Sequence, residues 1–396
     1  MKSSHRLQHA AVGDVPDRPR HLLRRIALGL VAVIALGFIA YSINKEFRQG
    51  SSVTQAIAGL TPWWVLGLGV GAALVMLLTT WTTLAPLPQL GFRGAFLSQH
   101  ASQAVGNLVP GPSALAVRFT MLRTYGVNGD DFARATVTVS LVTTVMTASM
   151  PIVGMALLAA VGAQDPQAQS LIPVAVAATV LAVLVVAGSG LLLGSSRATA
   201  AIARAGNRAV AGGRRLLRRP AGEDPGVAGA MRLRSRLIDG LRASGRQVVL
   251  FVAVLYWANG LLLVVSLWAA GVPTSALGIV AGLAVYTIGR LSTLVQITPG
   301  GVGVVEVAYT AAYTAYLGQQ YQGVVFAGVV LYRFGTYALP IGVGLVSAGI
   351  WAVTARRRYR DEELQHAAGL DLAPAPDPPA TLPADPPPTR KDHSHG

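Results

Sequence analysis

Residues 247–289 of the chain read QVVLFVAVLYWANGLLLVVSLWAAGVPTSALGIVAGLAVYTIG, a run without one charged side chain. A helix that crosses the hydrocarbon core of a bilayer needs about 20 predominantly apolar residues. The run is long enough for one such helix and the beginning of another. Four more runs of this kind are 49–92, 135–164, 166–196 and 307–332, apart from single flanking charges. The sequence therefore predicts an all-α, polytopic membrane protein, because these runs do not alternate as the strands of a membrane barrel do.

The composition of the 396 residues agrees with this class. Only 12% of the side chains are charged, which is about half the usual share of a soluble protein. The chain has no cysteine, which excludes disulfide scaffolds, thiolate metal sites and cysteine nucleophiles. On a soluble protein, a formal net charge of +15 would indicate a nucleic-acid partner. We expect no nucleic acid here, because the arginines form no recognisable binding motif and aromatic residues do not alternate with them.

Most charges lie in three segments that we expect to be cytoplasmic. Residues 1–25 contain six Lys and Arg, residues 194–246 contain twelve Arg, and four arginines within 356–360 follow the last apolar run. Basic residues close to a spanning helix usually stay on the cytoplasmic side. We therefore expect a multi-pass protein of the plasma membrane with both termini in the cytoplasm. The segment 194–246 is expected to be a solvated arginine-rich loop, or to contain an interfacial helix around Leu237.

The predicted organisation has three parts. Residues 1–25 form a cytoplasmic N-terminal segment, residues 26–355 form the transmembrane domain, and residues 356–396 form a disordered, proline-rich cytoplasmic tail. We interpret the first apolar stretch as a retained anchor helix, although a signal peptide has the same order of basic and apolar residues. The predicted spanning helices are Ile26–Asn44, Trp63–Leu84, Ala133–Val161, Leu171–Leu193, Val248–Ala270 and Gln322–Val353. The last should be bent or split, since it contains Pro340.

Two apolar segments carry helix-breaking motifs at their middle. Arg93–Tyr125 is interrupted by NLVPGP at 107–112, and Leu277–Leu317 is interrupted by TPGGVG at 298–303. Proline removes a backbone donor and glycine permits left-handed backbone angles, so each motif should end one helix and start another. With the basic segments placed in the cytoplasm, helix, interrupted hairpin and helix occur twice in opposite orientation. The sequence thus predicts an inverted repeat with two opposed re-entrant hairpins, the alternative being two pairs of kinked helices.

A few charged side chains remain within the predicted membrane segments: Arg118, Arg290, Glu306 and Arg333. Each costs at least about 2.5–3.5 kcal/mol at the centre of a spanning helix, so such residues usually face the bundle interior and find partners. We expect Glu306 to pair with Arg290 or Arg333. The surplus of arginine favours a cavity for an anionic headgroup, since a guanidinium can bind phosphate through two parallel hydrogen bonds. The alternative is an Arg–Glu–Arg network that only locks the bundle.

Further candidate binding residues flank the two breaks. Glycine and proline there let the backbone approach a ligand and leave free N–H groups where each helix restarts. Tyr309 and Tyr313 follow Glu306 on one helical face, where they could line the same cavity or belong to an aromatic belt at the interface. Besides the four charged residues, the predicted substrate site comprises Asn107, Pro110, Gly111, Pro299, Gly300, Gly301, Gly303, Tyr309 and Tyr313. We expect no metal ion and no cofactor.

The segment 298–306, TPGGVGVVE, resembles the Pro-Gly-Gly-x-Gly-x-x-Glu motif of the lysylphosphatidylglycerol synthase transmembrane-domain family, also called flippase-like membrane proteins. The segment 107–118 looks like the first-half motif of that family, and the resemblance covers roughly residues 25–355. Many relatives carry Gly-Glu after the first proline, whereas this chain has GPSA at 111–114. In the full-length synthases this domain is implicated in flipping an aminoacylated lipid that a separate soluble domain makes. The resemblance therefore implies a stand-alone flippase-like module without the aminoacyltransferase domain.

These expectations combine into one leading hypothesis. The chain binds an anionic lipid headgroup, of phospholipid or polyprenyl-phosphate type, in an intramembrane cavity and assists its translocation. We do not expect an enzyme, because only Glu306 and His100 lie at a plausible depth for acid–base catalysis. The alternatives are a membrane anchor for a lipid- or glycan-modifying synthase or glycosyltransferase, and an intramembrane lipid-modifying enzyme.

Overall fold

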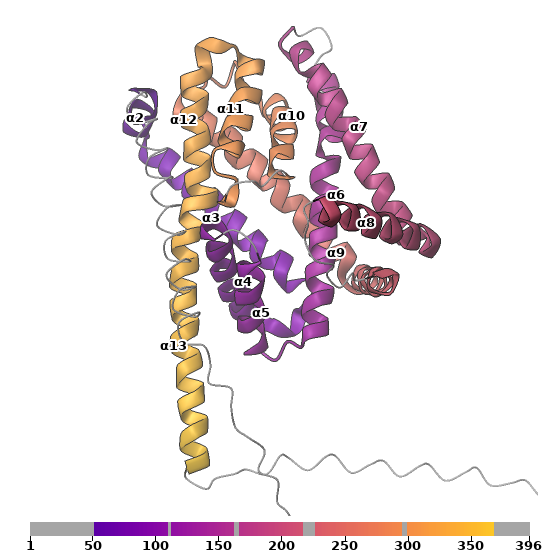
Figure 1. The fold of residues 1–396 in the computed structure, drawn as a ribbon. Coiled ribbons are helices and arrows are strands. Elements are labelled where there is room, and N and C mark those ends of the chain that lie inside the picture. Colours follow the sequence, from indigo (N-terminus) through magenta and orange to yellow (C-terminus); the bar gives the residue numbers. More distant parts are fainter. Residues whose placement is uncertain (1–50, 110–111, 162–165, 217–225, 295–298, 368–396) are drawn as a thin grey trace, which may run out of the picture. The chain divides into compact units, whose positions relative to one another are not determined.

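The computed structural model describes residues 51–109, 112–161, 166–216, 226–294 and 299–367, and every regular element in them is a helix (Figure 1). Four helical stretches of this described part are long and apolar enough to cross a membrane: Pro62–Leu84, Gly129–Ala159, Gly226–Ala270 and Gln319–Ala355. A fifth is counted if a bent pair between residues 175 and 208 is one span. The prediction of an all-α, polytopic membrane protein is confirmed.

Some predictions fall outside the described residues, namely the helix Ile26–Asn44, the segment 1–25 and most of the proline-rich tail. Contacts within the chain divide it into two units, residues 1–351 and 352–396. In the described part, the second unit contains only the end of the last helix, α13 (Leu339–Ala367). The helix packing and the cavity described below belong to the first unit.

The first half of the described chain contains α2 (Ser51–Ala58), the apolar helix α3 (Pro62–Leu84) and the first predicted hairpin. A 3-10 turn, η1 (Pro88–Leu90), leads into this hairpin, which consists of α4 (Gly91–Leu108) and α5 (Ser113–Arg123). The two helices pack against each other. α4 ends where Val109 becomes extended, with φ −123° and ψ 115°, because a residue before proline avoids helical angles.

A long helix, α6 (Gly129–Val161), follows the first hairpin and packs against α7 (Pro166–Gly194). The side chain of Asn128 caps the start of α6, since its Oδ1 accepts the N–H of Asp131 at 2.8 Å. Asp130 and Asp131 also place negative charge in the first turn, which the helix dipole favours. The predicted start of this helix, Ala133, is therefore about one turn too late.

Of the two expectations for 194–246, the arginine-rich loop is wrong for the described part of that segment, whereas the helix expected around Leu237 is present; its position at a membrane interface stays a prediction. Residues Ser196–Leu216 form α8, and the 45-residue helix α9 (Gly226–Ala270) begins well before its apolar part. The axis turns by 115° between α7 and α8. Alanine and arginine dominate α8, and both are strong helix formers, which explains why a polar sequence folds this way.

The second predicted hairpin consists of α10 (Ile279–Arg290) with η2 (Leu291–Leu294), and of η3 (Pro299–Gly301) with α11 (Val304–Leu317). α10 and α11 pack against each other. Gly300, Gly301 and Gly303 have φ values of 60°, 69° and 86°. These left-handed angles explain why glycine stands at the break. Each predicted break thus separates two packed helices, whereas entry of the hairpins from opposite sides of a bilayer stays a prediction.

The last apolar stretch is one continuous helical span, Gln319–Ala355, so it is not split as Pro340 led us to expect; a π-helical turn just before this proline interrupts its regular α-helical pattern. After a 3-10 turn, η4 (Gln319–Tyr321), it comprises α12 (Gln322–Arg333), the π-helical turn η5 (Phe334–Ala338) and α13. Proline cannot donate to the preceding turn, and its ring would collide with a carbonyl there. A π-helical turn widens the helix just before Pro340, since the N–H of Leu339 bonds the carbonyl of Phe334, five residues earlier. The wider turn leaves room for the proline ring.

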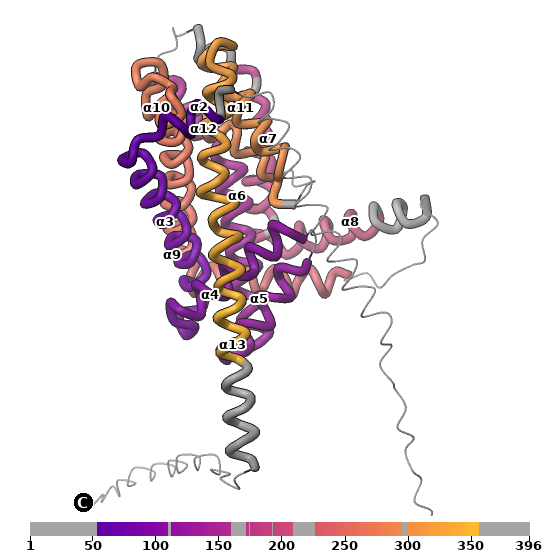
Figure 2. Tube along the Cα trace, turned by 90° about the vertical axis from the view of Figure 1, so that its left-hand side faces the viewer, coloured from indigo at the N-terminus to yellow at the C-terminus, as the bar shows by residue number. Residues whose placement is uncertain are grey.

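The two hairpins lie towards opposite ends of the helix bundle, α4 and α5 at one end and α10 and α11 at the other (Figures 1 and 2). Between them, α9 packs against α3, α6 and α12. η3, at the break of the second hairpin, contacts α4 of the first. The two hairpins therefore approach each other at their breaks.

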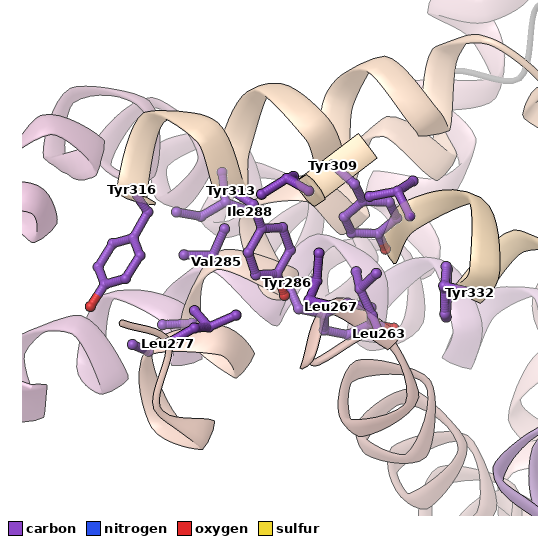
Figure 3. Packing of buried hydrophobic residues seen from close by; sticks show 14 of the residues in the cluster. Leu263, Leu267, Leu277, Val285, Tyr286, Ile288, Tyr309, Tyr313, Tyr316 and Tyr332 are labelled. Carbon is purple, nitrogen blue, oxygen red and sulfur yellow. The ribbon is translucent and has the colours of Figure 1, made fainter. Parts of the chain in front are cut away.

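The largest buried cluster fastens the second hairpin to α9 and α12 (Figure 3). Tyr286 and Tyr309 stack with their ring centroids 5.7 Å apart, and Tyr332 meets Tyr309 edge-on at 6.0 Å. Such aromatic pairs contribute about 0.5–1.5 kcal/mol each beyond the area they bury. Gly289 makes the stack possible, since a Cβ there would overlap the ring of Tyr309. The cluster fixes the helix ends that carry the functional candidates described next.

Candidate functional site

A cavity of about 830 Å³ lies where the two hairpins meet, and all three predicted arginines line it. Arg118 comes from α5, Arg290 from the end of α10, and Arg333 from the end of α12. These residues are far apart in the sequence, so the fold itself brings them together. The volume lies within the range of about 300–1,000 Å³ that is typical of pockets for drug-sized ligands.

Arg333 is held by the break of the second hairpin. Its Nε donates to Oε1 of Glu306 at 2.6 Å, and its Nη2 donates to the carbonyl of Gly300 at 3.0 Å. Oε2 of Glu306 accepts the N–H of Gly303 at 2.7 Å, so the carboxylate also caps α11. The guanidinium lies 4.5 Å from the ring centroid of Tyr337. Of the two predicted pairings of Glu306, the structure has the one with Arg333.

Arg290 has neutral partners. Its Nη1 lies 3.3 Å from the hydroxyl of Tyr286, and its guanidinium stacks over the ring of Tyr256 at 4.1 Å from the centroid. Such a contact stabilises a cation without neutralising it. The Nε of Arg290 is buried and has no hydrogen-bond partner among the described residues.

Arg118, like Arg290, has only neutral hydrogen-bond partners among the described residues. Its Nη2 donates to Oγ1 of Thr83 at 2.9 Å, and that hydroxyl in turn donates to Oε1 of Gln99 at 2.7 Å. The Nε of Arg118 is buried and, within the described part of the chain, unpartnered. A chain of neutral groups therefore orients Arg118 while its full positive charge remains.

The electrostatics of the cavity follow from these three environments. No Asp or Glu is among the described residues that line it, and the nearby Glu306 is already paired with Arg333. Arg118 and Arg290 have no carboxylate partner in the described residues. A cavity with two uncompensated guanidinium groups attracts anions, and the planar forks suit the oxygens of a phosphate.

The predicted tyrosines divide between cavity and core. Tyr309 lines the cavity, and its hydroxyl is buried without a partner among the described residues. Tyr313 does not line the cavity. Its side chain points into the core, where its hydroxyl donates to the carbonyl of Gly282 at 2.7 Å. The choice of Tyr313 as a binding residue is therefore corrected. One helical face carries both tyrosines, but the cavity extends over only the first turns of α11.

The residues of the two breaks have different roles. Asn107 and Gly300 line the cavity. The carbonyl of Asn107 accepts the hydroxyl of Tyr337 at 3.0 Å, and a Cβ on Gly300 would overlap the ring of that tyrosine. Tyr337 thus contacts both breaks. Of the remaining predicted residues, Pro299, Gly301 and Gly303 shape the turn before α11, whereas Pro110 and Gly111 lie outside the described residues.

His100 belongs to a different environment from Glu306. It lies in α4, is fully buried, and its Nε2 is 3.2 Å from the hydroxyl of Thr80. It does not line the cavity. The acid–base pair that the enzymatic alternative requires is therefore not assembled by these two residues.

Most of the neutral polar lining of the cavity was not predicted from the sequence. Gln99 and Gln103 line it from α4 together with the predicted Asn107, and Thr143 and Thr147 line it from α6. Their spacing of four residues places each set on one helical face. Such stripes of amide and hydroxyl side chains within apolar segments indicate a polar cavity, and they are visible in the sequence.

Comparison of the sequence with models of known protein families identifies a family to which the chain is similar. The model of a family described as "Lysylphosphatidylglycerol synthase TM region" matches residues 26–344, which is most of the chain. A search of curated proteins found no match. The matched range contains both hairpins and every residue discussed in this section.

Proposed function

The chain belongs to the lysylphosphatidylglycerol synthase transmembrane family, and on this basis we propose that it binds the anionic headgroup of a membrane lipid between its two hairpins and assists the translocation of that lipid. The observation that carries the proposal is the pair Arg118 and Arg290, two partly buried arginines that line one cavity and have no carboxylate partner among the described residues. Buried arginines are unfavourable in a membrane protein unless something compensates them. A phosphate between them would do so.

The arrangement of the hairpins supports translocation rather than static binding. The cavity lies between α4–α5 and α10–α11, which come from opposite ends of the bundle (Figure 2). In transporters with inverted repeats, a central site between two broken hairpins opens to each side in turn. In this proposal the hairpins enter the bilayer from opposite sides, and Asn107 and Gly300, the lining residues next to the two breaks, flank the headgroup. Their contact through Tyr337 is then the closed position of one gate.

The proposal includes an orientation. The exposed arginines of α8 and of the first turns of α9, among them Arg204, Arg208 and Arg232, would lie at the cytoplasmic surface of the plasma membrane, as would both termini. Basic side chains there interact with the anionic lipids of the inner leaflet by about 1 kcal/mol each. The proposal is transport and not catalysis, because Glu306 is engaged in two hydrogen bonds and His100 lies away from the cavity.

A flipping assay tests the proposal. The purified protein is reconstituted into liposomes that contain a fluorescent phosphatidylglycerol, and the fraction accessible to an impermeant quencher is followed with time. We expect Arg118→Ala and Arg290→Ala each to slow the protein-dependent exchange by about tenfold or more, since each removes a charge-assisted contact. Arg236→Ala is the matched control, because Arg236 forms an exposed ion pair with Asp130 outside the cavity. Exchange that is equally fast in all variants would refute the site.

A further inference from the structure

The positive charge of the cavity is not balanced by the described part of the chain. The helices and turns that line it contain four carboxylates, Asp130, Asp131, Asp239 and Glu306. The first two form ion pairs with Arg236 and Arg134, and Glu306 pairs with Arg333. Asp239 is exposed and lies about 25 Å along α9 from the lining residue Tyr256, at the helical rise per residue. Within the described residues, Arg118 and Arg290 therefore give the cavity a surplus of two positive charges.

The ends of these two arginine side chains are the parts that a ligand can reach. Their Nε atoms are buried, and Nη2 of Arg118 and Nη1 of Arg290 already contact the hydroxyl groups of Thr83 and Tyr286. Nη1 of Arg118 and Nη2 of Arg290 have no hydrogen-bond partner among the described residues and, unlike the Nε atoms, are not fully buried. Guanidinium nitrogens only donate hydrogen bonds, and charged acceptors satisfy them best. Each hairpin therefore offers the cavity one charged donor group.

The number of charges distinguishes two classes of phosphate. A phosphate diester carries one negative charge, so it compensates only one of the two guanidinium groups. A phosphate monoester loses its second proton at about pH 6 and carries nearly two negative charges at neutral pH. A charge that stays uncompensated at membrane depth is unfavourable. A dianion leaves neither arginine in that state, whereas a monoanion leaves one.

We infer that the cavity selects a dianionic phosphate monoester over a monoanionic phosphate diester. The inference rests on the proposed function, whose site it shares, and narrows the class of headgroup. In it, Arg118 reaches the phosphate from the first hairpin and Arg290 reaches it from the second. Neutral amide side chains of the lining, such as Gln103 and Asn107, supply further donors around the phosphate.

Two lipids that differ by one methyl group test the inference. Dioleoyl phosphatidic acid is a phosphate monoester, and dioleoyl phosphatidylmethanol is the corresponding diester with one charge fewer. The purified full-length protein in detergent micelles is titrated with each lipid at about pH 8, where the monoester is dianionic, and the dissociation constants are measured by microscale thermophoresis. We expect phosphatidic acid to bind about tenfold more tightly, since it makes a second charge-assisted contact. Water-soluble glycerol 3-phosphate has the same monoester without acyl chains and separates a free phosphate ester from a lipid headgroup.

Variants that change the charge of the cavity give a sharper test. Arg118→Gln and Arg290→Gln each leave one positive charge, so the preference for phosphatidic acid over phosphatidylmethanol should fall to about twofold or less. Arg118→Lys and Arg290→Lys keep the charge and should keep the preference, although the affinity for both lipids falls with the loss of the planar donor fork. Their retained preference shows that the glutamine variants act through charge and not through disturbed folding. Arg236→Gln is the matched control, because Arg236 pairs with Asp130 outside the cavity.

The outcomes separate this inference from the proposed function. Equal affinity for the two lipids, or a preference that persists in the glutamine variants, overturns the inference and leaves the proposed function intact. If neither lipid binds, or if binding does not depend on Arg118 and Arg290, the proposed function fails with it. Glycerol 3-phosphate that binds as tightly as phosphatidic acid supports the selection of a dianion but contradicts the lipid of the proposed function.

Discussion

The Nε of Arg333 lies 2.6 Å from Oε1 of Glu306, and this ion pair joins the end of α12 to the first turn of α11. Both side chains are mostly buried, with 15% and 18% of their surface exposed. The second carboxylate oxygen accepts the N–H of Gly303, and the second donor of Arg333 reaches the carbonyl of Gly300. The pair therefore fixes the break of the second hairpin. Its charge is balanced internally, which leaves Arg118 and Arg290 to set the potential of the cavity.

Removing one partner of this pair should destabilise the fold. Glu306→Gln leaves the guanidinium of Arg333 without its counter-charge, and breaking a buried pair in this way typically costs about 3–5 kcal/mol. We expect a lower melting temperature of the purified protein in detergent. The double variant Glu306→Gln, Arg333→Gln should lose less stability than the sum of the two single variants, because neither charge is then left alone. Additive losses would show that the pair is not coupled.

Much of this architecture could be predicted from the sequence. Long uncharged runs predicted the spanning helices. The Pro-Gly motifs at 107–112 and 298–303 predicted the two breaks, because proline and glycine act on the backbone angles of their own positions. The gathering of Arg118, Arg290 and Arg333 could be anticipated since buried charges in lipid must face the interior. Whether each of them binds a ligand stays a prediction.

Other features depend on tertiary contacts that no local pattern encodes. Tyr309 and Tyr313 occupy the same face of α11 and both contact α10, yet Tyr309 also lines the cavity, whereas the hydroxyl of Tyr313 bonds the carbonyl of Gly282. The pairing of Glu306 with Arg333 rather than Arg290 likewise depends on where α12 lies. For the arginine-rich segment 194–246, a high density of charge is compatible with a solvated loop or with a helix, and the described residues are helical because alanine and arginine favour helix.

A side chain at Gly303 should be unfavourable for reasons of backbone geometry alone. It precedes α11 with φ 86°, and an added Cβ would meet no atom within 4 Å. Gly303→Ala should therefore cost about 1–2 kcal/mol through the left-handed angle. Gly342→Ala is the control, since that glycine is helical and equally open, and alanine should be neutral or stabilising there. Thermal unfolding of the two variants measures the difference, and equal melting temperatures would contradict the argument.

Tyr337→Phe tests the contact between the two breaks. The variant loses the hydrogen bond to the carbonyl of Asn107 but keeps the ring beside Arg333 and Gly300. We expect a loss of only about 0.5–1.5 kcal/mol in stability. Hydrogen exchange at the last turn of α4 should become faster, because that carbonyl no longer ties the turn to η5. Unchanged exchange there would show that the contact does not hold the first break in place.

The opposed orientation of the hairpins is open to a direct test, because the chain contains no cysteine and single cysteines can be introduced without background. Asp130 follows the first hairpin and Gln320 follows the second, and both are exposed. If the repeat is inverted with the basic segments in the cytoplasm, an impermeant maleimide added to intact cells should label Gln320→Cys and not Asp130→Cys. Arg204→Cys on α8 should behave as Asp130→Cys does, and permeabilised cells should give labelling of all three. Labelling of positions 130 and 320 from the same side would leave two kinked helix pairs in place of an inverted repeat. The cavity between the hairpins would then lack the two-sided access that translocation requires.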